Sequence, residues 1–244
     1  MKKLILILVM LVFFFASING DVYIKTKTHA DAMEVMGKKT PAKDEITEQW
    51  IGDNIFASIS QKQTVIIDLS KKKLYMIIHE SKSYVETTLP LDIKKLLPEQ
   101  VSQMMGMMKL TIKVTPTSET KMINKWKCTA YNMEMSMMMM KMNSKIWATK
   151  DVPFDWEKYQ NKFGVETFKS AMASMKIGND SINELKKIKG FQVKTDMTIS
   201  IMGANGKVTS DVIEITKKSA PANIYTIPAG YKKTDKLSPA AFSK

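Results

Sequence analysis

The stretch from Trp126 to Thr149 constrains the fold most, because it is long, apolar in alternation and free of proline and glycine. Seven of the ten residues from Met133 to Met142 are methionine. Aromatic and β-branched residues at its two ends favour extended strand. More than 20 residues are too many for one ordinary strand. The stretch therefore predicts two strands folded into a hairpin, with the turn somewhere in residues 136–139.

The methionines of this hairpin have two interpretations, as an apolar lining or as metal ligands. Thioether side chains are flexible, so they suit an irregular or exchangeable apolar filling better than a rigidly packed core. Thioethers are also soft ligands that select Cu(I), and same-face residues of a strand lie about 6.8 Å apart. The candidate ligands for such a metal site are Met135, Met137, Met139, Met140 and Met142.

Residues 1–20 have the pattern of a cleavable export signal. Lys2 and Lys3 precede an unbroken apolar run from Leu4 to Phe15, which is shorter than a bilayer-spanning helix, and small residues follow. We expect cleavage after Gly20, or alternatively after residue 16 or 17, and an uncleaved anchor is the other interpretation. The mature chain is therefore expected to be exported, as a soluble periplasmic or secreted protein.

Charge and cysteine content narrow the function classes. The formal net charge is +13, and loss of the two signal lysines would lower it by two, to +11. Such a surface favours anionic ligands or an anionic membrane surface, and is also typical of an ordinary solvated protein. No basic-aromatic cluster indicates nucleic-acid binding. With Cys128 as the one cysteine, an internal disulfide is excluded and the core must hold the fold. We expect a monomer.

Short alternating segments predict a large antiparallel sheet. They begin with a strand from Asp21 to Thr28, followed by a poorly periodic segment that ends in a loop around Pro41. Five pieces of five to eight residues then start about ten residues apart, as in a hairpin-linked meander. A strand is expected over 109–115, a polar turn after it, and a hairpin around 203–206. The five meander pieces are 46–53, 54–60, 64–70, 74–80 and 83–89.

Two segments switch to helical spacing. Residues 91–108 carry an amphipathic stripe, with Pro98 expected at the first helical position. Residues 154–188 predict a loop with a short helix, a helix over 163–175 that ends at 178–180, and a further short helix over 182–188. The fold class is α+β, mainly β: a curved antiparallel sheet of about eight to eleven strands, an open half-barrel with helices on its concave face. Residues 21–228 form a single domain, and 229–244 form a polar, loosely packed tail.

No catalytic motif occurs in the sequence. Nucleophile elbows, glycine-rich phosphate loops, zinc signatures and redox CxxC pairs are missing. His29 and His79 are most simply interpreted as surface histidines. Cys128 lies in a strand of alternating residues and is most simply interpreted as a small buried hydrophobic residue. We therefore expect no enzyme and no cofactor.

Several segments resemble an uncharacterised bacterial exported family with a LolA-like or LolB-like, lipoprotein-carrier-like half-barrel. The most specific is V-x-P-T-x-E-T-K-x-I-x-K-W-K-C-x-x-Y from Val114 to Tyr131, supported by WIGDNIF, by IWATKDVP from Ile146 and by IPAGY from Ile227. Many members carry glycine where Trp126 or its neighbour stands. The resemblance implies a concave sheet, lidded by helices, that holds acyl chains.

The expected function is binding of a hydrophobic or amphipathic, lipid-like molecule between sheet and helices. The alternatives are Cu(I) binding by the methionine hairpin and a structural envelope protein with a closed core. The basic surface would suit an anionic headgroup. The candidate groove residues are Met104, Met108, Met135, Met137, Phe168 and Met172.

Overall fold

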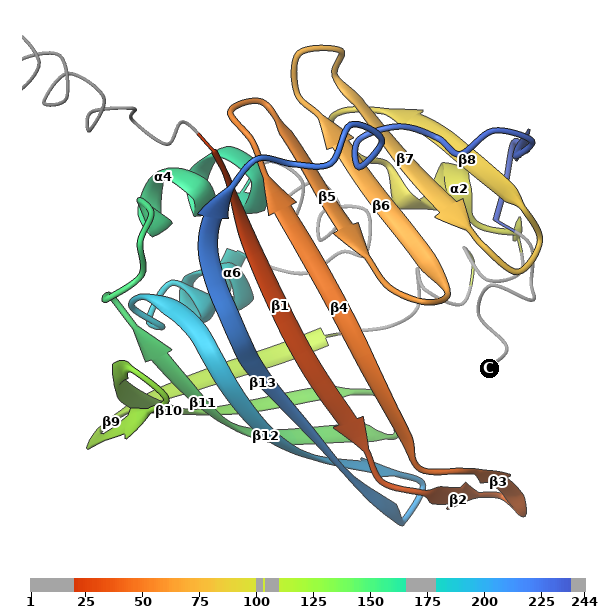
Figure 1. Ribbon diagram of the computed structural model, residues 1–244. Helices are drawn as coiled ribbons and strands as arrows, with labels where there is room; N and C mark the ends of the chain where they lie inside the picture. The colour runs from red at the N-terminus through yellow and green to blue at the C-terminus, as the bar shows by residue number, and fades with distance from the viewer. Residues whose placement is uncertain (1–19, 100–102, 104–109, 166–178, 238–244) are drawn as a thin grey trace, which may run out of the picture.

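One twelve-stranded sheet dominates the structure, a computed structural model that describes residues 20–99, 103, 110–165 and 179–237 (Figure 1). The sheet is strongly bent and does not close into a barrel, which confirms the expected fold class. Its strands are β1 (Asp21–Ala30), β4 (Lys43–Ile51), β5 (Ile55–Ile59), β6 (Gln63–Asp68), β7 (Lys73–Ile78), β8 (Ser83–Thr88), β9 (Leu110–Ile123), β10 (Trp126–Met137), β11 (Met140–Thr149), β12 (Phe191–Ile201), β13 (Ala204–Lys218) and β14 (Lys232–Lys233).

Two meanders meet at the first strand. The strand order is β14-β8-β7-β6-β5-β4-β1-β13-β12-β11-β10-β9, and each long strand pairs antiparallel with its neighbours. The short β14 pairs parallel with β8. Because β1 lies between β4 and β13, the N-terminal strand joins a β4–β8 wing to a β9–β13 wing.

The sheet has an inner and an outer apolar face over β1 and β4–β8. Successive residues of a strand point to opposite faces. Val22 and Ile24 belong to one core cluster, and Tyr23 between them belongs to another with Trp50. We call the face of Val22 and Ile24 the inner face and that of Tyr23 the outer face. With both faces buried, these strands are more apolar than a half-exposed meander.

Short helices cover the inner face. They are α2 (Ile93–Leu96), α4 (Trp156–Tyr159), the π-helical η2 (Gln160–Val165) and α6 (Asn179–Leu185). Leu96, Tyr159 and Phe163 pack into the inner cluster. Helix α6 packs on the edge strand β9, where the Glu184 carboxylate accepts a hydrogen bond of 2.7 Å from the Val114 N–H. This bond uses a donor that an edge strand otherwise leaves unpaired.

The C-terminal segment covers the outer face. Side chains from Ala220 to Tyr231 pack on the outer cluster, and the Tyr225 hydroxyl donates to Asp21 across 2.5 Å. Strand β14 follows, and Leu237 is buried in the inner cluster with its N–H on the Leu96 carbonyl. The expectation of a loosely packed tail from residue 229 was therefore wrong up to Leu237, because scattered apolar residues among the lysines anchor it.

Other segments differ from what their local sequence predicts. The segment before Pro41 contains a hairpin, β2 (Met33–Val35) and β3 (Lys38–Thr40). The polar run 116–121, expected to be a turn, is part of β9, because β10 pairs with it. Helix α6 begins at Asn179, within the 178–180 segment where a helix end was expected, and Asn and Asp are also common helix-starting residues. The helix expected before this segment lies mostly outside the described residues. As expected, Pro98 separates the short helix α2 from a second helical stretch, of which Glu99 and Gln103 are described. The rest of that stretch lies outside the described residues, as does the part of the expected helix over 163–175 that follows Val165.

Candidate functional site

The methionine hairpin forms as expected, with its turn at Met138 and Met139. Met135 lies opposite Met142, and Met137 lies opposite Met140. Directly opposed residues of an antiparallel pair project from the same face. These four methionines therefore share one face, whereas Met139 lies in the turn and is 64% exposed.

The same face continues as an apolar strip across five strands. Ile112 of β9 pairs with Met135, and Ile199 of β12 pairs with Met142. We call this set the apolar strip of the inner face. Its members are Leu110, Ile112, Val114, Met133, Met135, Met137, Met140, Met142, Met197, Ile199, Ile201 and Val208.

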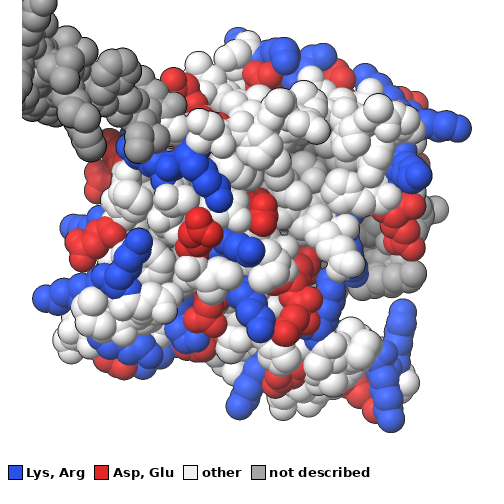
Figure 2. Space-filling view, in the orientation of Figure 1, with Lys and Arg blue, Asp and Glu red and all other residues white. Residues whose placement is uncertain are grey.

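Directly behind the strip, the opposite face of these strands is polar. Lys113, Glu134 and Lys141 alternate with members of the strip and are exposed. Figure 2, which views the molecule in the orientation of Figure 1, shows lysine and acidic side chains interleaved over the surface. Beside the strip, the β9–β13 wing is therefore amphipathic, with one solvated face and one face built for apolar contact. Further along β10 and β11 the opposite face is apolar and buried, at Trp126, Cys128 and Trp147.

The apolar strip is only partly covered. Ile112 and Val114 are buried against Ile182 and Leu185, under the helix α6 and the residues after it. Towards β12 the strip residues, such as Ile199, are partly exposed. Adjoining apolar side chains that keep some exposure on a concave surface are typical of a binding groove.

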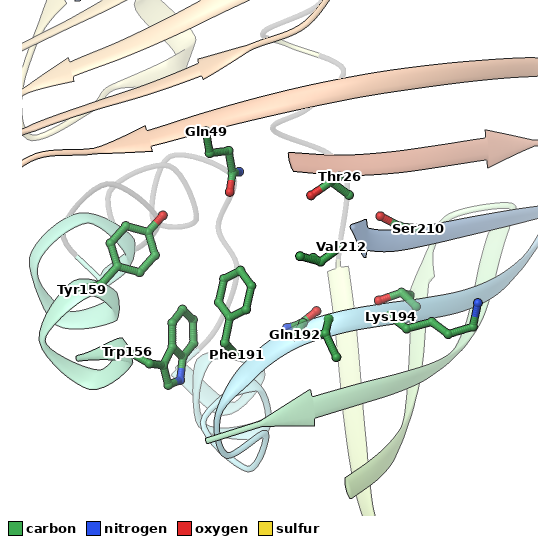
Figure 3. Close-up of a pocket in the computed structure, with 11 residues that line it drawn as sticks. Thr26, Gln49, Trp156, Tyr159, Phe191, Gln192, Lys194, Ser210 and Val212 are labelled. Atoms are coloured by element: carbon green, nitrogen blue, oxygen red, sulfur yellow. The ribbon is translucent and has the colours of Figure 1, made fainter. Parts of the chain in front are cut away.

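A pocket of about 320 Å³ adjoins the strip (Figure 3). Thr195 and Ser210 line it, two residues along their strands from the strip members Met197 and Val208. The pocket is thus continuous with the strip along β12 and β13. Its lining residues are Thr26 and Gln49 from β1 and β4, Trp156 and Tyr159 from α4, Phe191, Gln192, Val193, Lys194 and Thr195 from β12, and Ser210 and Val212 from β13.

Aromatic rings form one side of the pocket. Trp156 packs edge-on against Phe191 with ring centroids 5.4 Å apart, and Tyr159 lies 5.7 Å from Phe163. The Asp155 side chain caps α4 by accepting from the Lys158 N–H. These contacts hold the rings in place over the sheet.

Polar groups face the aromatic side. Gln49, Thr26 and Ser210 lie across the pocket from Trp156, and the Tyr159 hydroxyl points towards the side of Gln49 (Figure 3). Burial raises the pKa of Tyr159 to about 12, so its hydroxyl is a neutral donor and acceptor at neutral pH. The pocket therefore offers uncharged hydrogen-bonding groups beside an apolar wall.

The structure places Met135 and Met137 of the expected groove on the apolar strip. Met104, Met108, Phe168 and Met172 lie outside the described residues. The pocket lining from β1, β4 and α4 was not expected, since Gln49 and Thr26 look like ordinary strand residues in the sequence. No local signal could have found them, because the long-range pairing of β1 brings them together.

Titratable groups elsewhere are engaged in structural pairs. His29 lies 2.6 Å from Asp44, whose hydrogen bond raises the pKa of the exposed imidazole. The ring nitrogens of His79 lie 3.0 Å from the Thr64 and Tyr231 hydroxyls. Cys128 is buried, as expected, and burial raises the pKa of its thiol.

In the part of the chain that the structure describes, no three His, Cys, Asp or Glu side chains lie close enough together to hold a metal ion. The copper alternative gains no support from the structure: Met139 lies apart in the turn, and the shared face of the other four candidate methionines equally suits apolar contact. Of the described helices, none is long and apolar enough to cross a membrane.

Comparison with solved structures gives weak similarities. A chain in a structure of PNGF-II is 10% identical with a TM-score of 0.40; the match covers 91% of this chain and 32% of that one. A Vibrio parahaemolyticus domain whose description places it among outer membrane lipoprotein-sorting proteins is 7% identical with a TM-score of 0.29, covering 85% and 90%. TM-scores this low do not show that two proteins share the same fold.

Comparison at the sequence level identifies the family. No curated protein sequence matches the chain. A family model described as a domain of unknown function, DUF4412, matches residues 42–231, which is more than half of the chain and includes most of the pocket lining. The chain therefore belongs to the DUF4412 family.

Proposed function

We propose that the protein binds a hydrophobic or amphipathic, lipid-like molecule on its inner face, and that it acts by binding rather than by catalysis. The observation that carries this proposal is the partly exposed apolar strip on β9–β13, continuous with a pocket of about 320 Å³. That volume is within the range of small-molecule sites.

The geometry suggests how such a ligand would lie. An acyl chain would run over the strip, where Met135, Met137 and Met142 can change rotamer to fit chains of different shape. A polar group of the ligand would reach the pocket, where Gln49 and Ser210 can hydrogen bond with it. This division between an apolar lining and a few convergent polar groups is typical of ligand sites.

The proposal includes the compartment and the carrier-like role. Residues 1–20 have the pattern of an export signal, so the binding protein would act in the periplasm or outside the cell. The sequence resemblance to LolA-like carriers implies transfer of an acylated or lipid molecule, and that transfer is part of the proposal.

Native mass spectrometry of the protein from its own envelope tests the proposal. We expect a lipid-sized mass on the wild-type chain. The double variant Met137→Gln with Met142→Gln keeps side-chain length but places two amides on the strip, and it should weaken binding at least about tenfold. The matched control is Met122→Gln, a methionine that is 62% exposed near the opposite end of the sheet; it should bind as the wild type does.

The same measurements give the results that would contradict lipid binding. Protein that carries no lipid and takes up no fluorescent fatty acid would contradict the proposal. Equal fatty-acid binding by the strip variant and the wild type would contradict it as well. A copper-sized mass increment in place of lipid would instead favour the thioether alternative.

A further inference from the structure

Four exposed methionines gather at three hairpin turns. Met36 joins β2 to β3, Met138 and Met139 join β10 to β11, and Met202 joins β12 to β13. They are 82%, 68%, 64% and 50% exposed, respectively. Solvent-exposed turns usually carry polar residues or glycine, so methionine at all three needs a reason.

Backbone conformation makes these choices more unusual. Met36, Met138 and Met202 have φ angles of 51°, 51° and 52°, in the left-handed region that disfavours side chains such as methionine. At three other turns the same conformation is taken by polar residues, Lys72, Lys82 and Asn124. A methionine at these positions does not favour the left-handed backbone conformation, and its exposed side chain does not contribute to the core. Strained, exposed residues of this kind are candidates for function.

The three turns lie together at one end of the molecule. The Met202 N–H donates to the Met139 carbonyl across 3.3 Å. The Met33 side chain of β2 packs on Gly206 of β13, where a Cβ would lie 3.2 Å from the sulfur. Figure 1 places the β2–β3 hairpin and the β12–β13 turn side by side at the lower right. The four exposed methionines therefore form one edge, which we call the methionine rim.

Lysines flank the methionine rim. Lys38, Lys141 and Lys207 are exposed, each within five residues of a turn methionine, and none forms an ion pair with another described residue. Lys side chains also project from the corner of Figure 2 at which β2 and β3 lie. Apolar tips flanked by these three lysines, against one exposed carboxylate without an ion pair to a described residue, Glu134, complement the boundary between acyl chains and anionic headgroups.

We propose that the methionine rim docks the protein on a membrane surface that contains anionic lipid. The methionines enter the headgroup–acyl boundary, and the flanking lysines contact the headgroups. This docking goes beyond the proposed ligand binding and does not require the inner face to hold lipid. If both hold, docking brings the end of the apolar strip at Met137 and Met140 to the bilayer.

Vesicle sedimentation tests the rim with the chain that starts at Asp21. We expect binding to vesicles of phosphatidylglycerol and phosphatidylcholine, weaker binding to phosphatidylcholine alone, and loss of binding at high salt. The triple variant Met36→Asn, Met138→Asn, Met202→Asn should bind at least about tenfold more weakly. Asparagine tolerates positive φ, so this variant should fold at least as stably as the wild type.

Matched controls separate the rim from general effects. Lys38→Gln, Lys141→Gln and Lys207→Gln should each weaken binding about fivefold. The exposed lysines Lys127, Lys189 and Lys217 lie at the other end of the sheet, and the same change there should have a smaller effect. Met122→Asn with Ile213→Thr, which alters exposed apolar residues away from the rim, should leave binding unchanged.

Two outcomes would overturn the proposal. One is a wild-type protein that does not sediment with the anionic vesicles, or a rim variant that sediments equally well. The other is a rim variant that changes the oligomeric state in analytical ultracentrifugation without changing vesicle binding, which would assign the rim to a protein interface. A strip variant further from the turns, Met133→Gln with Met135→Gln, should lose ligand binding and still bind vesicles, so failure of ligand binding and failure of docking are distinguishable.

Discussion

Gly190 is the residue where the chain has least room. It links the end of the helical region to β12, with a φ of +105°, and a Cβ there would lie 2.4 Å from the carbonyl oxygen of Thr149. That distance is shorter than any real Cβ contact, and the opposing atom is backbone that cannot move alone. The strand β12, and with it one wall of the pocket, depends on this close approach.

We predict that Gly190→Ala lowers the free energy of unfolding by at least about 3 kcal/mol, because strain in φ adds to the backbone clash. Gly203→Ala is the matched control: its φ is +89°, but a Cβ there meets no atom within 4 Å. It should cost only about 1 kcal/mol. Urea unfolding of both variants measures the difference, and equal losses would refute the steric argument.

At the scale of elements, Glu86 ties three strands together. It lies on β8, and its carboxylate is 2.6 Å from the Lys73 amine of β7 and 3.4 Å from the Lys233 amine of β14. The hydrogen bond from Lys73 holds the pKa of Glu86 below its usual 4.5. The stabilisation is therefore fully present above pH 4.5 and is lost as the pH falls through the lower folded-state pKa.

Glu86→Gln should destabilise the protein at pH 7, and the difference from the wild type should shrink as the pH drops below 4.5. Unfolding free energies measured between pH 7 and pH 3 give this comparison. Glu157→Gln is the control, since Glu157 is exposed and has no ion pair with a described residue. A difference for Glu86→Gln that stays constant with pH would contradict the ion-pair explanation.

The C-terminal segment is the other element whose attachment can be tested. Tyr225→Phe removes the 2.5 Å hydrogen bond to Asp21, which joins the segment to the first strand. We expect a loss of about 1.5–3 kcal/mol, the usual range for a hydrogen bond to a charged group. Hydrogen exchange over residues 219–231 should rise in this variant. Tyr75→Phe, in the same outer cluster, should leave that exchange unchanged.

For the whole molecule, the sheet holds together without a disulfide. Cys128 is a free, buried thiol, and the inner and outer clusters supply the core. The C-terminal segment completes this core by covering the outer face and then contributing Leu237 to the inner one. A chain shortened before residue 219 would expose both clusters.

We predict that the mature protein lacks residues 1–20, because two lysines followed by a short apolar run match a cleavable signal. Intact-mass measurement on protein from the native envelope gives the result directly. A mass that begins at Asp21 agrees with the prediction, and cleavage after residue 16 or 17 would shift only the site. A mass that retains Met1 would indicate an anchor.

The sequence by itself determined the strands and the methionine hairpin. Alternation is a local property, so β1, the meander over β4–β8 and a turn within residues 136–139 could be predicted without knowledge of partners. It also placed Met135 and Met137 on one face, because that follows from their spacing alone. The mainly β fold class followed from the number and spacing of such segments.

Only the tertiary structure decided how these parts combine. The placement of β1 between β4 and β13, the strand conformation of the polar run in β9 and the docking of the C-terminal segment all depend on partners distant in the sequence. Local propensity is worth tenths of a kcal/mol per residue, and long-range pairing and burial outweigh it. The pocket and the methionine rim arise from the same cause, because each collects residues that long-range strand pairing alone brings together.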